Sequence, residues 1–94
     1  MTDTKSVHVI VTGRVQGVWY RGWTVEQARI LGLDGWVRNR FDRSVEAVFS
    51  GPSAAVDTMV DLCRRGPSSA RVDHLDVGNW AEHPGSGFHQ RPTV

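Results

Sequence analysis

The chain has 94 residues, of which 39% are hydrophobic and 22% are charged, and its formal net charge at pH 7 is +1. A chain of this length predicts one domain with one modest core. The near-neutral charge argues against nucleic-acid or membrane binding driven by bulk charge, because proteins that bind in that way usually carry a large basic excess.

The only cysteine is Cys63, which excludes an intramolecular disulfide and fits a reducing compartment. The N-terminal residues contain no apolar stretch long enough for a signal peptide or a membrane span. We therefore expect a cytoplasmic protein without a membrane partner.

The first half of the chain predicts a strand, a helix and a hairpin. Hydrophobic β-branched residues alternate over 7–12, which indicates a strand with a buried face. Apolar residues at helical spacing over 23–31 predict a helix that ends at Gly32. The segments GWVRNRF (35–41) and SVEAVFS (44–50) then predict two strands joined by a tight turn at Asp42–Ser44.

The second half predicts another helix followed by another strand. The apolar stripe of the helix consists of Val56, Met59, Val60 and Cys63, at i, i+3, i+4 and i+7. Gly66-Pro67 ends the helix, and ARVDHLDV (70–77) predicts a strand with a bulge near Asp73, where the apolar pattern slips. The segment FHQRPTV (88–94) is compatible with a short edge strand that its proline would stop.

The order strand, helix, strand, strand, helix, strand predicts a ferredoxin-like α+β sandwich. We expect an antiparallel sheet with both helices on one face and a possible short fifth strand at an edge. The expected domain is a single one over residues 1–94, with a core at about 7–91 and flexible residues 1–6.

The segment GRVQGVWYR, residues 13–21, connects the first predicted strand to the first predicted helix. Backbone N–H groups at a helix N-terminus favour anions. Gly13 and Gly17 allow close backbone approach to a ligand, and Arg21 adds a guanidinium. The glycines alone are equally compatible with an ordinary turn. Val15 stands where cysteine-dependent phosphatases open their loop with the nucleophile, so no phosphocysteine can form at this site.

The segment WVRNR, residues 36–40, is the second candidate for a functional role. In a strand, Asn39 shares a face with Val37 and Phe41, and that face is predicted to look inward. A buried amide must find hydrogen-bond partners. Two interpretations follow: Asn39 bonds to local backbone near the hairpin, or its carbonyl oxygen accepts a hydrogen bond from a positioned water.

Further positions follow these two segments in a consistent order. They are Thr24, Ala28, LGL at 31–33, GWVRN at 35–39, SVE at 44–46, Gly51-Pro52 and Gly66-Pro67. Together with GRVQGVWYR, they resemble the acylphosphatase family over roughly residues 7–91. The resemblance implies the ferredoxin-like fold and an enzyme that hydrolyses acyl phosphates to a carboxylate and inorganic phosphate, with no metal and no cofactor.

The resemblance also implies roles for individual residues. Arg21 would bind the phosphate and Asn39 would orient the attacking water. The phosphoryl oxygens would be held by the backbone amides of Val15, Gln16, Gly17, Val18, Trp19 and Tyr20. One departure is the turn Asp42-Arg43-Ser44, where the family commonly has Asp-Gly, so the turn type is open.

The expected partners are a small acyl phosphate and inorganic phosphate, the latter as product and inhibitor, and we expect a monomer. The four histidines do not cluster at metal-ligand spacing, and Cys63 on the apolar stripe is expected to be an inert core residue. The alternative is a non-catalytic module that binds an anion or RNA. Trp19 and Tyr20 could stack on bases, but the segment 44–50 lacks an aromatic RNA-binding motif, and we expect no nucleic-acid partner.

Overall fold

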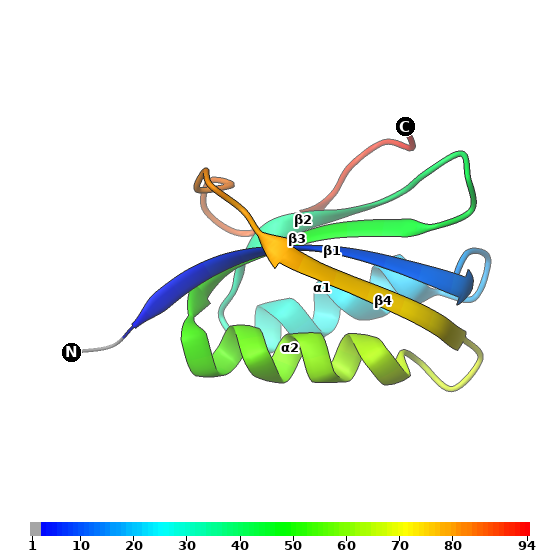
Figure 1. Cartoon of the computed structure of the whole chain (residues 1–94), viewed down its shortest axis with the longest axis horizontal. Helices are drawn as coiled ribbons and strands as arrows, with labels where there is room; N and C mark the ends of the chain where they lie inside the picture. Colours follow the sequence, from blue (N-terminus) through cyan, green and yellow to red (C-terminus); the bar gives the residue numbers. More distant parts are fainter. Residues whose placement is uncertain (1–2) are drawn as a thin grey trace.

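The computed structural model describes residues 3–94 (Figure 1). These residues form one five-stranded sheet with the order β4-β1-β3-β2-β5, and two helices cover one face of it. The elements are β1 (Thr4–Arg14), α1 (Tyr20–Ile30), β2 (Asp34–Asn39), β3 (Val45–Pro52), α2 (Ser53–Arg65), β4 (Arg71–Asn79) and β5 (Phe88–Gln90). The predicted ferredoxin-like α+β sandwich is confirmed.

The sheet is mixed rather than wholly antiparallel. The pairs β1–β3, β1–β4 and β2–β3 are antiparallel, as predicted, whereas β5 runs parallel to β2. After β4 at one edge, the chain crosses to the opposite edge, and β5 enters there in the direction of β2. The short fifth strand is therefore present, and it ends at Gln90, two residues before Pro92.

Strand β1 starts earlier in the chain than we expected. Residues 4–6, expected to be flexible, belong to β1 because β3 continues to Pro52 and supplies partners for them. The hydroxyl groups of Ser6 and Ser50 also share a hydrogen bond of 2.7 Å. Strand β1 therefore begins three residues before the predicted start, the flexibility expected of residues 1–6 stays a prediction, and Met1 and Thr2 lie outside the described residues.

The predicted bulge at Asp73 is confirmed. Thr12 pairs with His74 and Gly13 pairs with Val72, so Asp73 is the extra residue on β4. A Cβ on Gly13 would lie 2.3 Å from the carbonyl oxygen of Arg71. Glycine therefore allows β1 and β4 to approach closely where the chain leaves the sheet.

The core lies between the sheet and the helices. Alternate residues of β1 pack with the inner faces of β2, β3, α1 and α2; the cluster includes Val7, Val9, Val11, Ala28, Val37, Phe49, Val56, Met59 and Cys63. Burial raises the pKa of the Cys63 thiol to about 12. The thiol is thus protonated at neutral pH, as expected for an inert core cysteine.

Local hydrogen bonds fix the ends of helix α1. Gly32 has a φ of 70°. Its N–H donates to the Arg29 carbonyl, and the N–H of Leu33 donates to the Ala28 carbonyl. This pair of bonds is a Schellman motif, so the predicted helix stop is confirmed. Helix α1 begins at Tyr20, three residues before the predicted start, and the buried Thr24 hydroxyl donates to the Tyr20 carbonyl.

Gly35 provides a test of this packing with Gly78 as a matched control. Gly35 has a φ of 140°, and a Cβ there would lie 1.8 Å from the Val48 carbonyl oxygen, whereas Gly78 has open space. We expect Gly35→Ala to lower the free energy of unfolding by about 2 kcal/mol or more. Gly78→Ala should change it by less than about 1 kcal/mol. Urea unfolding measures both, and equal effects would contradict the packing described for β2 and β3.

Candidate active site

The β1–α1 loop, residues 15–19, has the backbone conformation of an anion-binding concavity. Gly17 and Trp19 have positive φ angles of 72° and 67°, whereas Gln16 and Val18 do not. Alternation of this kind turns successive N–H groups toward a common centre. Helix α1 starts directly after Trp19, so its N-terminus adds donors and a positive dipole end to the same place.

The N–H groups of this loop have no backbone acceptor. Within residues 3–94, those of Gln16, Gly17, Val18 and Trp19 make no hydrogen bond to another backbone group. The N-cap Trp19 provides no side-chain cap, and the first turn of α1 contains no acidic residue. The loop and helix start therefore present a set of donors that an external anion can satisfy.

The loop is held in place from its inner side. The side chains of Val15 and Val18 are buried in the core. The hydroxyl of Ser69 donates to the Val18 carbonyl at 3.0 Å, and that of Tyr20 donates to the Cys63 carbonyl at 2.7 Å. Burial, followed by the interaction with Cys63, raises the pKa of Tyr20, so the phenol remains a neutral donor. These contacts fix the loop, and its N–H groups need no partner in the protein to hold their positions.

The side chain of Gln16 ties the loop to the β2–β3 hairpin. Its Nε2 donates to the carbonyl oxygens of Arg40 at 2.9 Å and Ser44 at 2.8 Å. Arg40 directly follows Asn39, the last residue of β2. The Gln16 amide therefore sets the distance between the loop and the end of the strand that carries Asn39.

A cavity of about 180 Å³ lies in front of the loop. Its lining consists of Val15, Gly17, Trp19, Tyr20, Arg21, Gly22 and Gln90. We call it the Arg21 cavity. In the part of the chain that the structure describes, no carboxylate lies within ion-pair distance of Arg21. Arg21 thus lines the cavity, and its positive charge has no close ion-pair partner among the described residues.

Trp19 forms one wall of the Arg21 cavity. Its ring packs against Gly22 so closely that a Cβ on Gly22 would lie 2.2 Å from the indole Nε1. The side chain is nevertheless 59% exposed. Trp19 therefore lines the Arg21 cavity and does not belong to the hydrophobic core.

The structure brings most of the predicted site residues together. Arg21 and four of the six predicted loop residues line the cavity, whereas the Gln16 side chain turns to the hairpin and the Val18 side chain turns inward. Asn39 stands at the end of β2, outside that lining. Its Oδ1 is buried and has no hydrogen-bond partner among the described residues.

Two contributions to the site were missed in the sequence. Gln90 lines the cavity from β5, and no local pattern reveals it because its position depends on the parallel pairing with β2. The clamp made by the Gln16 side chain was also missed. A polar residue with a long side chain in a glycine-rich loop is a weak signal, since most such residues face solvent.

Comparisons with known proteins agree with this geometry. The family model described as acylphosphatase matches residues 7–90. An acylphosphatase of Rhodospirillum rubrum is 58% identical over 90 residues, which cover 96% of this chain and 99% of that protein. The chain belongs to the acylphosphatase family. Its activity is therefore the hydrolysis of acyl phosphates, which yields inorganic phosphate.

Other acylphosphatases support the same assignment. The acylphosphatase of Rhizorhabdus wittichii is 58% identical over 92 residues, covering 98% of this chain and 93% of its own. The structure of an acylphosphatase from Coxiella burnetii superimposes with a TM-score of 0.90 at 30% identity, covering 95% of this chain and 94% of that one. The similarity thus extends over the β1–α1 loop and the hairpin together.

Two kinds of feature are absent from residues 3–94. No helix in this range is both long and apolar enough to cross a membrane. No group of three or more His, Cys, Asp or Glu side chains in this range is arranged to hold a metal ion.

The Gln16 clamp can be tested with Gln27 as a matched control. Gln16→Ala removes two hydrogen bonds, each with a net value of about 0.5–1.5 kcal/mol, so the free energy of unfolding should fall by about 1–3 kcal/mol. The loop would also lose its fixed distance from Asn39, and kcat for benzoyl phosphate should fall roughly tenfold or more. Gln27→Ala removes a glutamine whose side chain makes no such clamp and should change both quantities little. Wild-type kcat in folded Gln16→Ala would show that the clamp has no part in positioning the site.

Proposed function

We propose that the N–H groups of the β1–α1 loop and Arg21 hold the phosphoryl group of an acyl phosphate while Asn39 orients the attacking water. The observation that carries this proposal is the set of N–H groups at Gln16–Trp19 without backbone acceptors, next to the uncompensated Arg21. Acyl phosphates are the substrates of the family, and their phosphoryl group is an anion that such donors match.

Positioning and charge stabilisation supply most of the catalysis in this mechanism. The water oxygen attacks phosphorus, the bond between phosphorus and the bridging oxygen breaks, and the electron pair of that bond leaves with the carboxylate. The leaving group is a weak base, so it departs without a general acid. The equatorial oxygens carry the charge of the transition state, and Arg21 with the loop N–H groups would stabilise it there.

Asn39 would act on the water rather than on the phosphate. Its Oδ1 is an acceptor without a partner among the described residues, and an unsatisfied buried acceptor costs about 1–3 kcal/mol. A water that donates to this carboxamide would remove that cost and would be held at the end of β2. The clamp from Gln16 to the neighbouring Arg40 carbonyl would keep the water in register with the loop.

The attacking water releases a proton, and some group near the phosphoryl group must accept it. The lining of the Arg21 cavity contains no carboxylate, histidine or cysteine, and its one phenol, that of Tyr20, donates to the Cys63 carbonyl. We therefore assign the proton to an oxygen of the phosphoryl group itself. The products are then a carboxylate and inorganic phosphate, and the phosphate would inhibit by occupying the same donors.

We also propose that the protein is a single-domain, cytoplasmic monomer with no nucleic-acid partner. The free thiol of Cys63 fits a reducing compartment, and a net charge of +1 attracts polyanions weakly. One core cluster joins the sheet and both helices, which supports a single domain. Size-exclusion chromatography with light scattering tests the monomer directly.

Arg21 should act in both the ground state and the transition state, because it holds the phosphate throughout. Arg21→Ala removes the two charge-assisted hydrogen bonds that a bidentate guanidinium donates, each of about 1.5–3 kcal/mol, and kcat/KM should fall on the order of a thousandfold. Inorganic phosphate should no longer raise the melting temperature of this variant. Arg21→Lys keeps the charge without the planar fork and should recover only part of the activity. Phosphate stabilisation of Arg21→Ala equal to that of wild type would place the phosphate elsewhere.

Asn39 should affect the chemical step alone. Asn39→Ala should lower kcat roughly a hundredfold or more, the scale seen when a positioning group is lost, while the Kd for phosphate stays within a few fold. Since Oδ1 has no partner within residues 3–94, the melting temperature should change little. A structural amide predicts the reverse pattern, with a lower melting temperature and an unchanged kcat. Measurement of kcat, phosphate Kd and melting temperature on one preparation distinguishes the two roles.

A further inference from the structure

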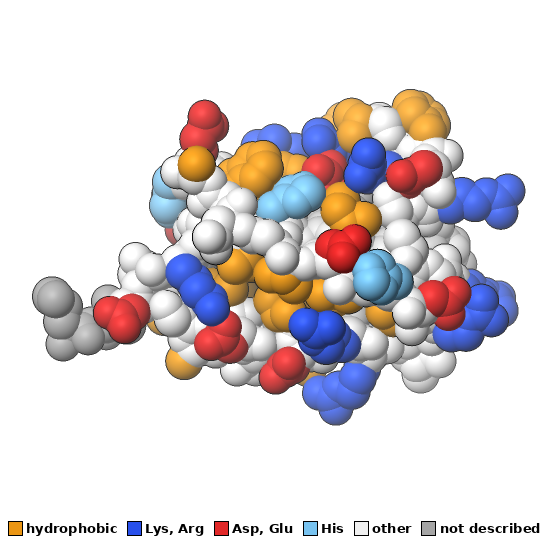
Figure 2. Space-filling view, in the orientation of Figure 1, with side chains coloured by type: hydrophobic (Ala, Val, Ile, Leu, Met, Phe, Trp, Pro, Cys, Tyr) orange, Lys and Arg blue, Asp and Glu red, His pale blue; other side chains and the backbone are white. Residues whose placement is uncertain are grey.

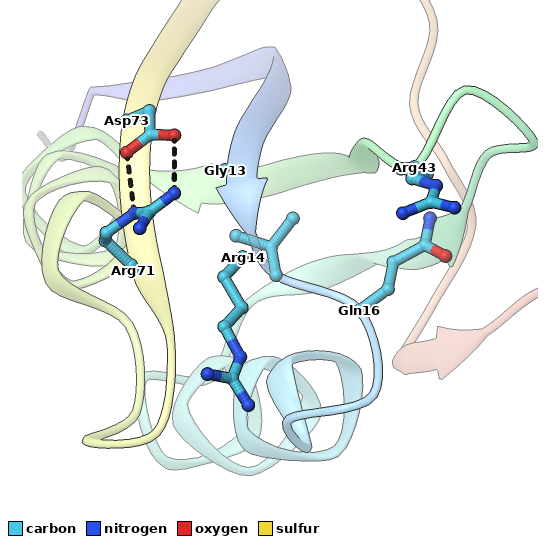
Figure 3. Close-up of a pocket in the computed structure, with 7 residues that line it drawn as sticks. Gly13, Arg14, Gln16, Arg43, Arg71 and Asp73 are labelled. Carbon is cyan, nitrogen blue, oxygen red and sulfur yellow. Dashed lines mark hydrogen bonds and ion pairs between the residues drawn. The ribbon is translucent and has the colours of Figure 1, made fainter.

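A second and larger cavity, of about 430 Å³, adjoins the β1–α1 loop (Figure 3). Three arginines, Arg14, Arg43 and Arg71, belong to its lining, and we call it the arginine cavity. They come from three places: the end of β1, the β2–β3 turn and the start of β4. In the space-filling view, several Lys or Arg side chains, with acidic side chains between them, lie at the end of the molecule where β1 ends and β4 starts, and others lie elsewhere on this face (Figure 2).

Most of this positive charge has no counterpart in the protein. Arg71 pairs with Asp73, the one acidic residue of the lining, through contacts of 3.0 and 3.4 Å. Among the described residues, no carboxylate forms an ion pair with Arg14 or Arg43. The lining thus keeps two guanidinium groups free to bind an oxyanion, with five donors on each.

The arrangement of these arginines is locally unfavourable. Arg14 and Arg71 are direct cross-strand partners, and like charges in such pairs are destabilising. Arg43 has a φ of 76°, a conformation that favours glycine. Departures from local preference of this kind are concentrated at functional sites, where the surrounding structure compensates for them.

The arginine cavity lies where the acyl part of a substrate would point. Val15 lines both cavities, so they share a wall. An in-line transfer places the leaving carboxylate on the side of phosphorus opposite the attacking water. Asn39 belongs to β2, whereas Arg14 and Arg71 belong to β1 and β4, on the other side of β3. Arg43 lines the same cavity from the β2–β3 turn. A water held at Asn39 therefore directs the acyl group toward β1 and β4.

We propose that the arginine cavity binds a second anionic group on the acyl side of the substrate, a carboxylate or a phosphate. The preferred substrates are then acyl phosphates whose acyl moiety is itself charged. This inference rests on the proposed placement of the phosphoryl group in the Arg21 cavity and of the water at Asn39. It assigns specificity to Arg14 and Arg43 while catalysis stays with Arg21 and Asn39.

The test compares benzoyl phosphate with meta- and para-carboxybenzoyl phosphate, and with para-(phosphonomethyl)benzoyl phosphate, which separates carboxylate from phosphate recognition. Each kcat/KM is divided by the rate of uncatalysed hydrolysis, so that the effect of the substituent on reactivity cancels. We expect wild type to prefer at least one charged substrate by about tenfold or more, the scale of one charge-assisted hydrogen bond.

Arg43→Gly is the most informative variant. Glycine suits the positive φ at this position, so the variant should be as stable as wild type or more stable while it loses most of the preference for charged substrates. Adding Arg14→Ala to Arg43→Gly should lower the preference for charged substrates further than Arg43→Gly alone. Arg64→Ala removes an exposed arginine of α2 outside the arginine cavity and serves as the control for overall charge, with an expected change in the ratio of less than twofold.

The outcomes separate the two levels of the proposal. If wild type hydrolyses benzoyl phosphate without preference for any charged substrate, or if the preference persists in the Arg14→Ala/Arg43→Gly double variant, the arginine cavity does not bind the acyl side. If Arg64→Ala lowers the preference as much as Arg43→Gly, overall charge explains it and the cavity does not. If wild type turns over none of these substrates, the proposed mechanism fails and this inference fails with it.

Discussion

Four consecutive backbone N–H groups, at residues 16–19, stand without a backbone acceptor among residues 3–94, and the organisation of the site depends on them. Unsatisfied donors are costly where water is excluded, so they persist only where an anion or solvent can reach them. The protein keeps them in place from behind, through the buried Val15 and Val18 and the Ser69 hydroxyl on the Val18 carbonyl. An anion thus meets donors that are already oriented, and binding requires little reorganisation.

The remainder of the fold determines which side chains lie around these N–H groups. Gly13 allows β1 and β4 to approach where the loop begins, and the Asp73 bulge places Arg14 opposite Arg71. Gln16 connects the loop to the hairpin, so that the loop N–H groups and Asn39 belong to one rigid frame. The chemistry of acyl phosphates suits such a frame, because a good leaving group leaves little for an acid or a base to do.

Local patterns predicted the parts of the fold that depend on neighbours in sequence. Valine alternation located β1, Gly32 located the end of α1, and the slipped apolar phase located the bulge at Asp73. Features that depend on distant pairing were missed. Residues 4–6 join β1 only because β3 extends to Pro52, and Gln90 reaches the Arg21 cavity only because β5 lies parallel to β2. The resemblance pointed to Arg21 and Asn39, but the hydrogen bonds of the Gln16 side chain emerge only once the loop meets the hairpin.

The most direct measurement is a titration of ¹⁵N-labelled protein with inorganic phosphate, followed through the amide resonances. We expect the amides of residues 16–19 to shift together with a single Kd, and this Kd should equal the inhibition constant of phosphate against benzoyl phosphate hydrolysis. Amides on the far side of the sheet should not move. If phosphate inhibits the enzyme while these four resonances stay in place, the loop N–H groups do not hold the phosphoryl group.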